Sequence, residues 1–136
     1  MFNRIPNEFH LSDLGTSLGV MDFSQIPFSP RRIYWISGMT FEEPRGFHAH
    51  KRLNQVLVVQ QGSIKLDLYR GTKKSSFDIS NNENHIFIPA GSWREIRAVE
   101  EGSTILVVAD QVYDESDYIR SWDEYLKWFT KNGELQ

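Results

Sequence analysis

Two histidines, His48 and His50, stand one residue apart in the segment 45–51, and their types and spacing could carry proton-transfer chemistry. On an extended backbone, side chains alternate between faces with a period of two, so both imidazoles face the same space. Arg45 and Lys51 flank the pair with cationic donors. Imidazoles that titrate near neutral pH beside cations suit proton transfer on an anionic substrate. A metal site and ordinary packing are the alternatives that the rest of the chain must decide.

The composition is that of an ordinary globular chain of one domain. Its 136 residues are 40% hydrophobic and carry a formal net charge of −3, which does not favour binding to nucleic acid or to an anionic membrane. The chain has no cysteine, which excludes disulfides and thiolate metal ligands and leads us to expect a cytoplasmic protein. The first residues lack the apolar core of a signal peptide, and no apolar run is long enough to cross a bilayer.

The order of short strands and turns predicts an all-β domain over residues 1–136. Residues 1–30 contain several prolines and glycines and are predicted to form an N-terminal arm with short strands. Residues 31–112 contain a succession of β-rich segments separated by turn signals roughly every eight to twelve residues. Such a succession is typical of an antiparallel sandwich or barrel.

The sequence pattern changes in the tail, where residues 114–131 are predicted to form an α-helix. Asp114 or Ser116 is expected to cap its start, and residues 132–133 to end it. The segment 113–117 is interpreted as a solvated helix start without catalytic function. The helix has an apolar stripe, which is expected to pack on the barrel rather than bind a ligand. The stripe comprises Tyr118, Ile119, Trp122, Tyr125, Leu126 and Phe129.

The spacing around the histidine pair resembles the first motif of the cupin superfamily, Gly-x5-His-x-His followed by a glutamate and a glycine. Gln55 stands here at the glutamate position, and Gly62 at the glycine position. The segment 89–91 resembles the start of the second cupin motif, but Arg94 stands where that motif has a histidine. The resemblance implies a cupin-type antiparallel β-barrel, or jelly roll, with a C-terminal α-helix.

The two departures from the cupin motifs argue against a metal ion. An amide is a weak neutral ligand, and the guanidinium of Arg94 keeps its proton and repels a divalent cation. Two imidazoles, an amide and a guanidinium do not suit Zn²⁺, Fe²⁺ or Mn²⁺, so we expect neither a metal nor another cofactor. The same interior then becomes a site for organic acid/base chemistry, in which Arg94 is expected to bind a phosphate or stabilise an oxyanion.

Three segments together resemble a narrower family, the nucleotide-sugar 3,4-ketoisomerases of the cupin superfamily. They are residues 45–51, 88–95 and 113–120. The resemblance implies a metal-free isomerase that moves the keto group of dTDP-4-keto-6-deoxy-D-glucose from C4 to C3 through an enediol(ate), for deoxy-aminosugar and polysaccharide biosynthesis. It also implies a homodimer in which N-terminal strands exchange between subunits. One departure lies at residues 90–92, where relatives often have a second proline or a bulkier residue.

The resemblance and the chemistry together suggest a role for each site residue. The keto shift removes a proton beside a carbonyl and returns one to the neighbouring carbon, which needs a base with a pKa near neutrality. His50 is assigned as this base, His48 as its partner at the substrate oxygens, and Tyr34, the match to the family's tyrosine, as the proton shuttle between the oxygens. The residues expected to bind the nucleotide sugar are Arg94, Arg45, Lys51, Gln55, Trp93 and Arg97.

Two other functions stay open at this stage. A small barrel with two histidines could bind a sugar nucleotide without turning it over. A 3,5-epimerase would use a similar pair of histidine and tyrosine, although such enzymes usually have a longer chain and a different order of motifs. His10 and His85 have no motif around them and are expected to be structural.

Overall fold

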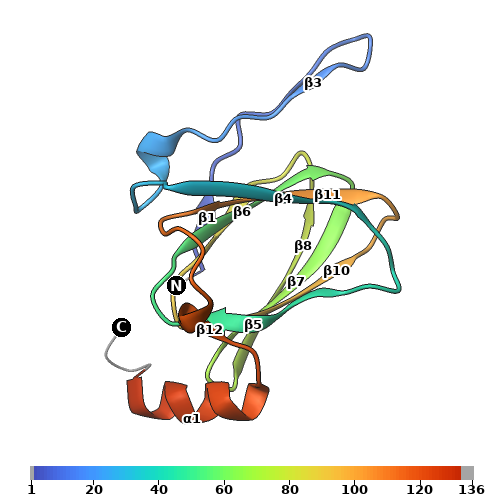
Figure 1. The fold of residues 1–136 in the computed structure, drawn as a ribbon. Helices are drawn as coiled ribbons and strands as arrows, with labels where there is room; N and C mark the ends of the chain where they lie inside the picture. Colours follow the sequence, from blue (N-terminus) through green and yellow to red (C-terminus); the bar gives the residue numbers. More distant parts are fainter. Residues whose placement is uncertain (1, 133–136) are drawn as a thin grey trace.

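The computed structural model describes residues 2–132, which fold into two five-stranded antiparallel sheets, a small hairpin and a C-terminal helix (Figure 1). In the first sheet the order is β1 (Arg4–Ile5), β9 (His85–Ile88), β6 (Gln55–Gln61), β11 (Ser103–Ala109), β4 (Arg32–Met39). In the second it is β12 (Tyr118–Ile119), β5 (Arg45–His50), β10 (Trp93–Ala98), β7 (Ser63–Arg70), β8 (Lys73–Ser80). The sheets face each other, which confirms the predicted cupin-type fold.

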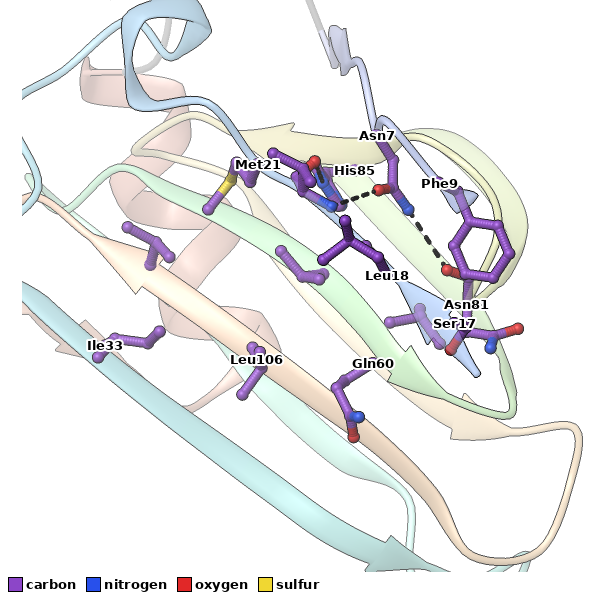
Figure 2. Close-up of a pocket in the computed structure, with 15 residues that line it drawn as sticks. Asn7, Phe9, Ser17, Leu18, Met21, Ile33, Gln60, Asn81, His85 and Leu106 are labelled. Atoms are coloured by element: carbon purple, nitrogen blue, oxygen red, sulfur yellow. Dashed lines mark hydrogen bonds between the residues drawn. The ribbon is translucent and has the colours of Figure 1, made fainter. Parts of the chain in front are cut away.

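The N-terminal arm follows the outer face of the first sheet. Strand β1 pairs with β9, and the hairpin of β2 (His10–Leu11) and β3 (Ser17–Leu18) projects away from the barrel (Figure 1). Figure 2 shows a groove of about 370 Å³ between the arm and the sheet. The Nε2 of His85 lies 3.2 Å from the backbone oxygen of Val20, which fits the structural role expected for this histidine. No helix within residues 2–132 is long and apolar enough to span a membrane.

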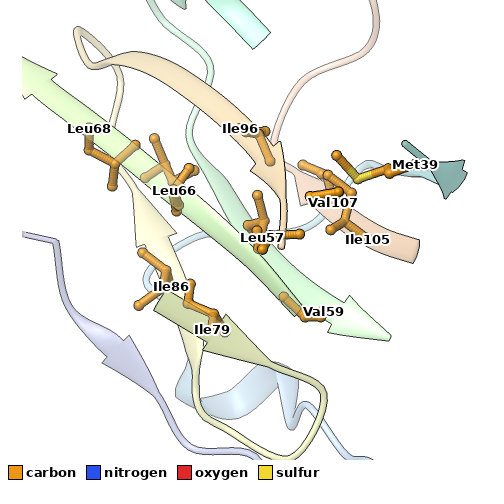
Figure 3. Close-up of a cluster of buried hydrophobic side chains, with 13 residues drawn as sticks. Met39, Leu57, Val59, Leu66, Leu68, Ile79, Ile86, Ile96, Ile105 and Val107 are labelled. Atoms are coloured by element: carbon orange, nitrogen blue, oxygen red, sulfur yellow. The ribbon is translucent and has the colours of Figure 1, made fainter. Parts of the chain in front are cut away.

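An apolar core fills most of the space between the sheets (Figure 3). Its side chains come from alternate positions of the facing strands, because successive residues of a strand point to opposite faces. Each fully buried leucine or isoleucine stabilises the fold by about 1.5–3 kcal/mol relative to an exposed one. The core residues include Leu57, Val59, Ile64, Leu66, Leu68, Ile79, Ile86, Ile88, Ile96, Ile105 and Val107.

Helix α1 (Trp122–Asn132) covers the outer face of the second sheet. Its residue Tyr125 is fully buried, and the phenol oxygen accepts a hydrogen bond from the backbone N–H of Gly71 at 3.0 Å and lies 2.8 Å from the oxygen of Gly91. Trp122, Leu126 and Phe129 pack in the same cluster. The prediction that the aromatic stripe of this helix packs on the barrel is therefore confirmed for these four residues.

The predicted start of the helix is wrong, because α1 begins at Trp122 and not near residue 114. Asp114 instead caps a short 3₁₀ turn, η2 (Glu115–Asp117), and accepts a hydrogen bond from the N–H of Ser116 at 3.0 Å. Tyr118 and Ile119 then form β12, which pairs with β5 at the edge of the second sheet. At the sheet edge the backbone of β12 pairs with β5, and the spacing of apolar residues in the sequence does not reveal such pairing. The helix ends at Asn132, and the stop predicted at residue 133 lies outside the described residues.

Candidate active site

A cavity of about 350 Å³ opens at one end of the barrel, between β4, β5 and the segment around β12. Strand β4 contributes Arg32 and Tyr34, and β5 contributes Arg45 and His48. Tyr118, from β12, and Arg120 close a third side. The cavity therefore combines one histidine, two phenols and three guanidinium groups, drawn from parts of the chain that are distant in sequence.

The backbone of β5 is bent where it approaches the cavity. Gly46 and Phe47 have φ angles of 91° and 57°, and the pairing of β5 with β10 shifts between Arg94 and Glu95. A Cβ atom at Gly46 would lie 2.9 Å from the backbone oxygen of Arg94, so glycine is required here. Such bulges re-aim the side chains that follow, and here the residue that follows is His48.

His48 faces the cavity as a neutral imidazole with a free ring nitrogen. Its Nδ1 lies 3.0 Å from the backbone oxygen of Gly46, an acceptor, so Nδ1 carries the proton and donates it. Its Nε2 is buried and has no hydrogen-bond partner. Burial is the main cause that lowers the pKa of His48 to about 3, and the nearby cation of Arg94 lowers it further. At neutral pH the Nε2 lone pair is thus available to accept a proton.

His50 lies behind His48, with their ring centroids 4.9 Å apart and the rings nearly perpendicular. The two imidazoles share one face of β5, as the alternation predicts, but His50 is only 1% exposed and does not line the cavity. Its Nδ1 lies 3.1 Å from the Oδ2 of Asp117. Burial, followed by the cation of Arg94, lowers the pKa of His50 far below its usual value.

Asp117 is a buried acidic residue of the site that the sequence interpretation missed. The segment 113–117 was expected to be a solvated helix start, but Asp117 is 4% exposed and its carboxylate faces His50. That expectation is wrong because the turn η2 directs Asp117 inward while its neighbours stay exposed. The two partners are 67 residues apart, and no spacing rule connects them.

A chain of hydrogen bonds leads from Arg94 to Tyr34. Arg94, which is 2% exposed, donates to the backbone oxygen of Ser92 at 3.0 Å and to the Oε1 of Gln55. This contact orients the amide of Gln55, so that its Nε2 donates to the Tyr34 hydroxyl at 3.1 Å. Burial raises the pKa of Tyr34, with the cation of Arg94 acting in the opposite direction. The phenol therefore stays protonated at neutral pH, and its own hydrogen is free to point to a substrate oxygen.

The residues at the cupin metal position do not fit a divalent cation. Burial lowers the pKa of Arg94 to about 10, which still leaves a cation at neutral pH. Gln55 offers one amide oxygen, and Arg94 already occupies it. Within residues 2–132, no three histidine, cysteine, aspartate or glutamate side chains gather in a way that could hold a metal. The donor set is that of an acid/base site.

The predicted binding residues lie in different places. Arg45 lines the cavity and pairs with Glu43 at 3.0 Å. Trp93 is 3% exposed and packs against Trp122 and Tyr125 of α1, on the opposite face of the sheet. The structure therefore does not bring all six residues together. Gln55 and Arg94 lie behind the cavity, while Lys51 and Arg97 are absent from its lining.

Two arginines of the cavity were not predicted. The guanidinium of Arg32 lies 4.9 Å from the ring centroid of Tyr34, and that of Arg120 lies 4.2 Å from the ring of Tyr118. Arg120 is held by Glu115 through two hydrogen bonds of 2.8 and 2.9 Å. Strand periodicity could have identified Arg32, because it stands two positions before Tyr34 and shares its face. Arg120 ends the segment 113–120 that carries the family resemblance, but no strand periodicity links it to the cavity.

Comparison with known proteins places these features in context. Residues 3–130 match the family model described as FdtA: WxcM-like, C-terminal. The chain is 34% identical over 132 residues to a TDP-4-oxo-6-deoxy-alpha-D-glucose-3,4-oxoisomerase from Aneurinibacillus thermoaerophilus, covering 96% of this chain and 95% of that relative.

Two solved structures are similar over nearly their whole length. A 3,4-ketoisomerase from Helicobacter canadensis has a TM-score of 0.85 and 34% identity, covering 95% of this chain and 97% of that one. The 3,4-ketoisomerase QdtA from Thermoanaerobacterium thermosaccharolyticum, as a histidine-to-asparagine mutant in complex with TDP-4-keto-6-deoxyglucose, has a TM-score of 0.86 and 30% identity, covering 96% and 95%.

Proposed function

Because this chain belongs to the FdtA family (WxcM-like, C-terminal), we propose that it is an enzyme that moves the keto group of TDP-4-keto-6-deoxyglucose from C4 to C3. The observation that carries this function is the pairing of a neutral His48, with a free Nε2, and a protonated Tyr34 in one cavity. Its product would serve deoxy-aminosugar and polysaccharide biosynthesis. We also propose a cytoplasmic location, since the chain has no cysteine.

The reaction balances with these two groups alone. The Nε2 of His48 takes the proton from C3, and the electrons of the C–H bond form the C3–C4 double bond of an enediolate whose charge rests on the C4 oxygen. Tyr34 gives its proton to that oxygen and takes the proton of the C3 hydroxyl. His48 then returns its proton to C4, and the C3 oxygen becomes the ketone. Substrate and product are isomers, so no hydride acceptor takes part.

The assignment of the base is revised relative to the sequence interpretation. His50 was assigned as the base, but it lies behind His48 and outside the cavity lining. A general base must come within hydrogen-bond reach of the proton it removes, and only His48 of the pair lines the cavity. We therefore propose His48 as the base, with His50 as the group that supports it.

The diphosphate of the substrate is proposed to bind the arginines around the cavity. Arg32, Arg45 and Arg120 present planar guanidinium groups, which bind phosphate oxygens in pairs. Arg45 keeps the role expected from the sequence. Arg94 was the first choice for this contact, but its burial and its bonds to Gln55 and Ser92 suit a positioning role instead.

A homodimer with exchanged N-terminal strands is proposed from the surface of the first sheet. The outer face of β4 exposes Ile33 and Trp35, which are 54% and 64% exposed, and the projecting hairpin exposes Leu14. Burial of such apolar area in a second copy of the chain would stabilise a dimer. Strand β1 adds two residue pairs to β9, and the same register could be formed with the β9 of a second copy. Light scattering coupled to gel filtration measures the oligomeric state.

Turnover in deuterated water tests the proposed function. The protein is mixed with TDP-4-keto-6-deoxyglucose and the sugar is followed by NMR. Formation of a 3-keto sugar supports the keto shift, and deuterium at C4 measures how far the proton on His48 exchanges with water before it is returned. Label at C5 would identify a 3,5-epimerase, and unchanged sugar that binds tightly would identify a non-catalytic binding protein. Either of the last two results would refute the proposal.

A further inference from the structure

Asp117 is a buried carboxylate that the steps above do not use. Three contacts fix it against the end of β5. Its Oδ1 accepts a hydrogen bond of 2.7 Å from the backbone N–H of Arg52, and its Oδ2 lies 3.1 Å from the Nδ1 of His50. Its backbone oxygen accepts a bond of 2.9 Å from the N–H of Lys51. The carboxylate therefore has a fixed position before any substrate binds.

This position determines which ring nitrogen of His50 carries the proton. An ionised carboxylate accepts hydrogen bonds and donates none, so the Nδ1 of His50 must be the donor. The Nε2 of His50 is then a lone pair, and it is buried without a hydrogen-bond partner. His48 has the same tautomer, fixed by the backbone oxygen of Gly46. Both imidazoles thus present unprotonated Nε2 atoms.

The tautomer matters because the ring of His50 lies directly against His48. The centroids are 4.9 Å apart in a perpendicular arrangement, and Tyr118 packs on both rings at 5.1 and 4.3 Å. When His48 takes the substrate proton, a cation forms in a site where Arg94 already holds positive charge. Such a cation is stabilised by a neutral neighbour backed by an anion, and destabilised by a second positive charge.

We propose that Asp117 is a positioning residue for the keto shift, which holds His50 as the neutral Nδ1–H tautomer and places a negative charge behind the histidine pair. The inference rests on the proposed function, since it gives the pair a reaction to support. Asp117 acts through His50 and touches neither the cavity nor the substrate. Together, Asp117 and a neutral His50 lower the free energy of the imidazolium that forms on His48 during turnover.

The first test reads the tautomer in the full-length protein. Two-bond ¹H–¹⁵N correlation spectra of ¹⁵N-histidine-labelled protein show which ring nitrogen is protonated, and the signals of His50 are assigned by their loss in His50→Gln. We expect Nδ1–H in the wild type, and a change of tautomer in Asp117→Asn, whose amide can donate to Nδ1. A wild-type His50 protonated at Nε2 would overturn the proposal, whatever the activity of the protein.

The second test measures turnover of TDP-4-keto-6-deoxyglucose. Asp117→Asn is expected to lower kcat about 10–100-fold, as for other groups that orient a functional histidine, with KM nearly unchanged. Asp114→Asn is the matched control, because Asp114 lies on the same turn, is 52% exposed and pairs with Arg52 at 3.2 Å. This control should keep both kcat and the His50 tautomer.

Asp117→Glu separates the charge of residue 117 from a merely structural role. It keeps a carboxylate and is expected to keep the Nδ1–H tautomer and to recover most of kcat. A glutamate variant as slow as the asparagine variant, or an asparagine variant with full kcat, would overturn the proposal. A wild-type protein that does not isomerise the sugar would refute the proposed function, while the tautomer would still report on the contact between Asp117 and His50.

Discussion

The interior of the barrel has two parts that differ in polarity. Along β6 the inward positions are Gln55, then Leu57 and Val59, and β10 begins the same way with Arg94 before Ile96. All five are nearly inaccessible to solvent. Gln55 and Arg94 form a polar layer with His48 and His50 at the base of the cavity, whereas the apolar layer fills the space shown in Figure 3. The same strands therefore build both layers, and the side chain at each inward position decides which layer it joins.

This difference shows that the polar layer serves function more than stability. A buried polar atom without a hydrogen-bond partner costs about 1–3 kcal/mol. In the part of the chain that the structure describes, four buried side-chain atoms lack a partner, and three of them belong to His48, His50 and Arg94. An all-apolar interior would avoid this cost. The two layers should therefore respond in opposite ways to substitution.

The largest expected effect is the loss of activity on changing His48 to asparagine. Removal of a positioned base lowers the rate by about 10²–10⁴-fold. The asparagine amide can donate to the backbone oxygen of Gly46 in place of Nδ1, and the Nε2 of His48 contributes no hydrogen bond to the fold, so the midpoint of thermal unfolding should not fall. Turnover followed by NMR and calorimetry measure the two quantities. A variant with full activity would refute the assignment of His48 as the base.

The apolar layer should show the reverse pattern when Leu66 is changed to alanine. Leu66 is fully buried in the core of Figure 3, and such a truncation costs about 2–5 kcal/mol of unfolding free energy. Denaturant titration measures the loss, and kcat is measured on protein kept folded at low temperature. We expect a kcat within about threefold of the wild type, because Leu66 does not line the cavity. A large loss of kcat would show that the two layers are coupled.

A pair of substitutions within the polar layer gives a smaller and more specific effect. Changing Arg94 to methionine leaves the Oε1 of Gln55 buried without its donor, which should cost about 1–3 kcal/mol. Adding Gln55→Met removes that orphaned acceptor, so the double variant should recover stability while activity stays low. Denaturant titration of both variants completes the comparison. A double variant less stable than Arg94→Met would show that the polar network stabilises the fold.

The sequence predicted the strands and the polar positions of the barrel better than it predicted which side chains contact each other. Strand alternation and turn signals predicted an antiparallel sandwich or barrel, and the resemblance to the cupin motifs narrowed this to the jelly roll and located Gln55 and Arg94 as departures from a metal site. Whether Arg94 meets the substrate or supports Tyr34 depends on burial, which a motif does not record. Tyr118 fits a helical stripe, yet it pairs with His50 in β12. Contacts between residues far apart in the chain are set by the packing of the sheets, so local pattern could not predict Asp117 or Arg120.

The smallest expected effect is the change of kcat/KM with pH. It shows whether the base behaves as the buried His48 or as an imidazole with an ordinary pKa. Burial lowers the pKa of His48 from 6.5 to about 3, so its unprotonated, active form persists as the solution becomes mildly acidic. We expect kcat/KM to stay nearly constant from about pH 8 to about pH 5.5, whereas a base with an unshifted pKa would lose activity roughly tenfold per unit below it. A decline of kcat/KM centred at pH 6.5 would contradict the neutral, buried imidazole.

Stability, unlike kcat/KM, should already change with pH in the mildly acidic range. The pKa of His48 is lower in the folded state than in the unfolded chain, so the unfolded state binds more protons between about pH 6.5 and pH 3. Folding is therefore weakened as the pH falls through this range, and His50, whose pKa is also lowered, acts in the same direction. The unfolding temperature of the wild type should fall more steeply with acid than that of His48→Asn, because the variant has lost one of the two imidazoles. Equal slopes of unfolding temperature against pH in the two proteins would show that protonation of His48 does not destabilise the folded state.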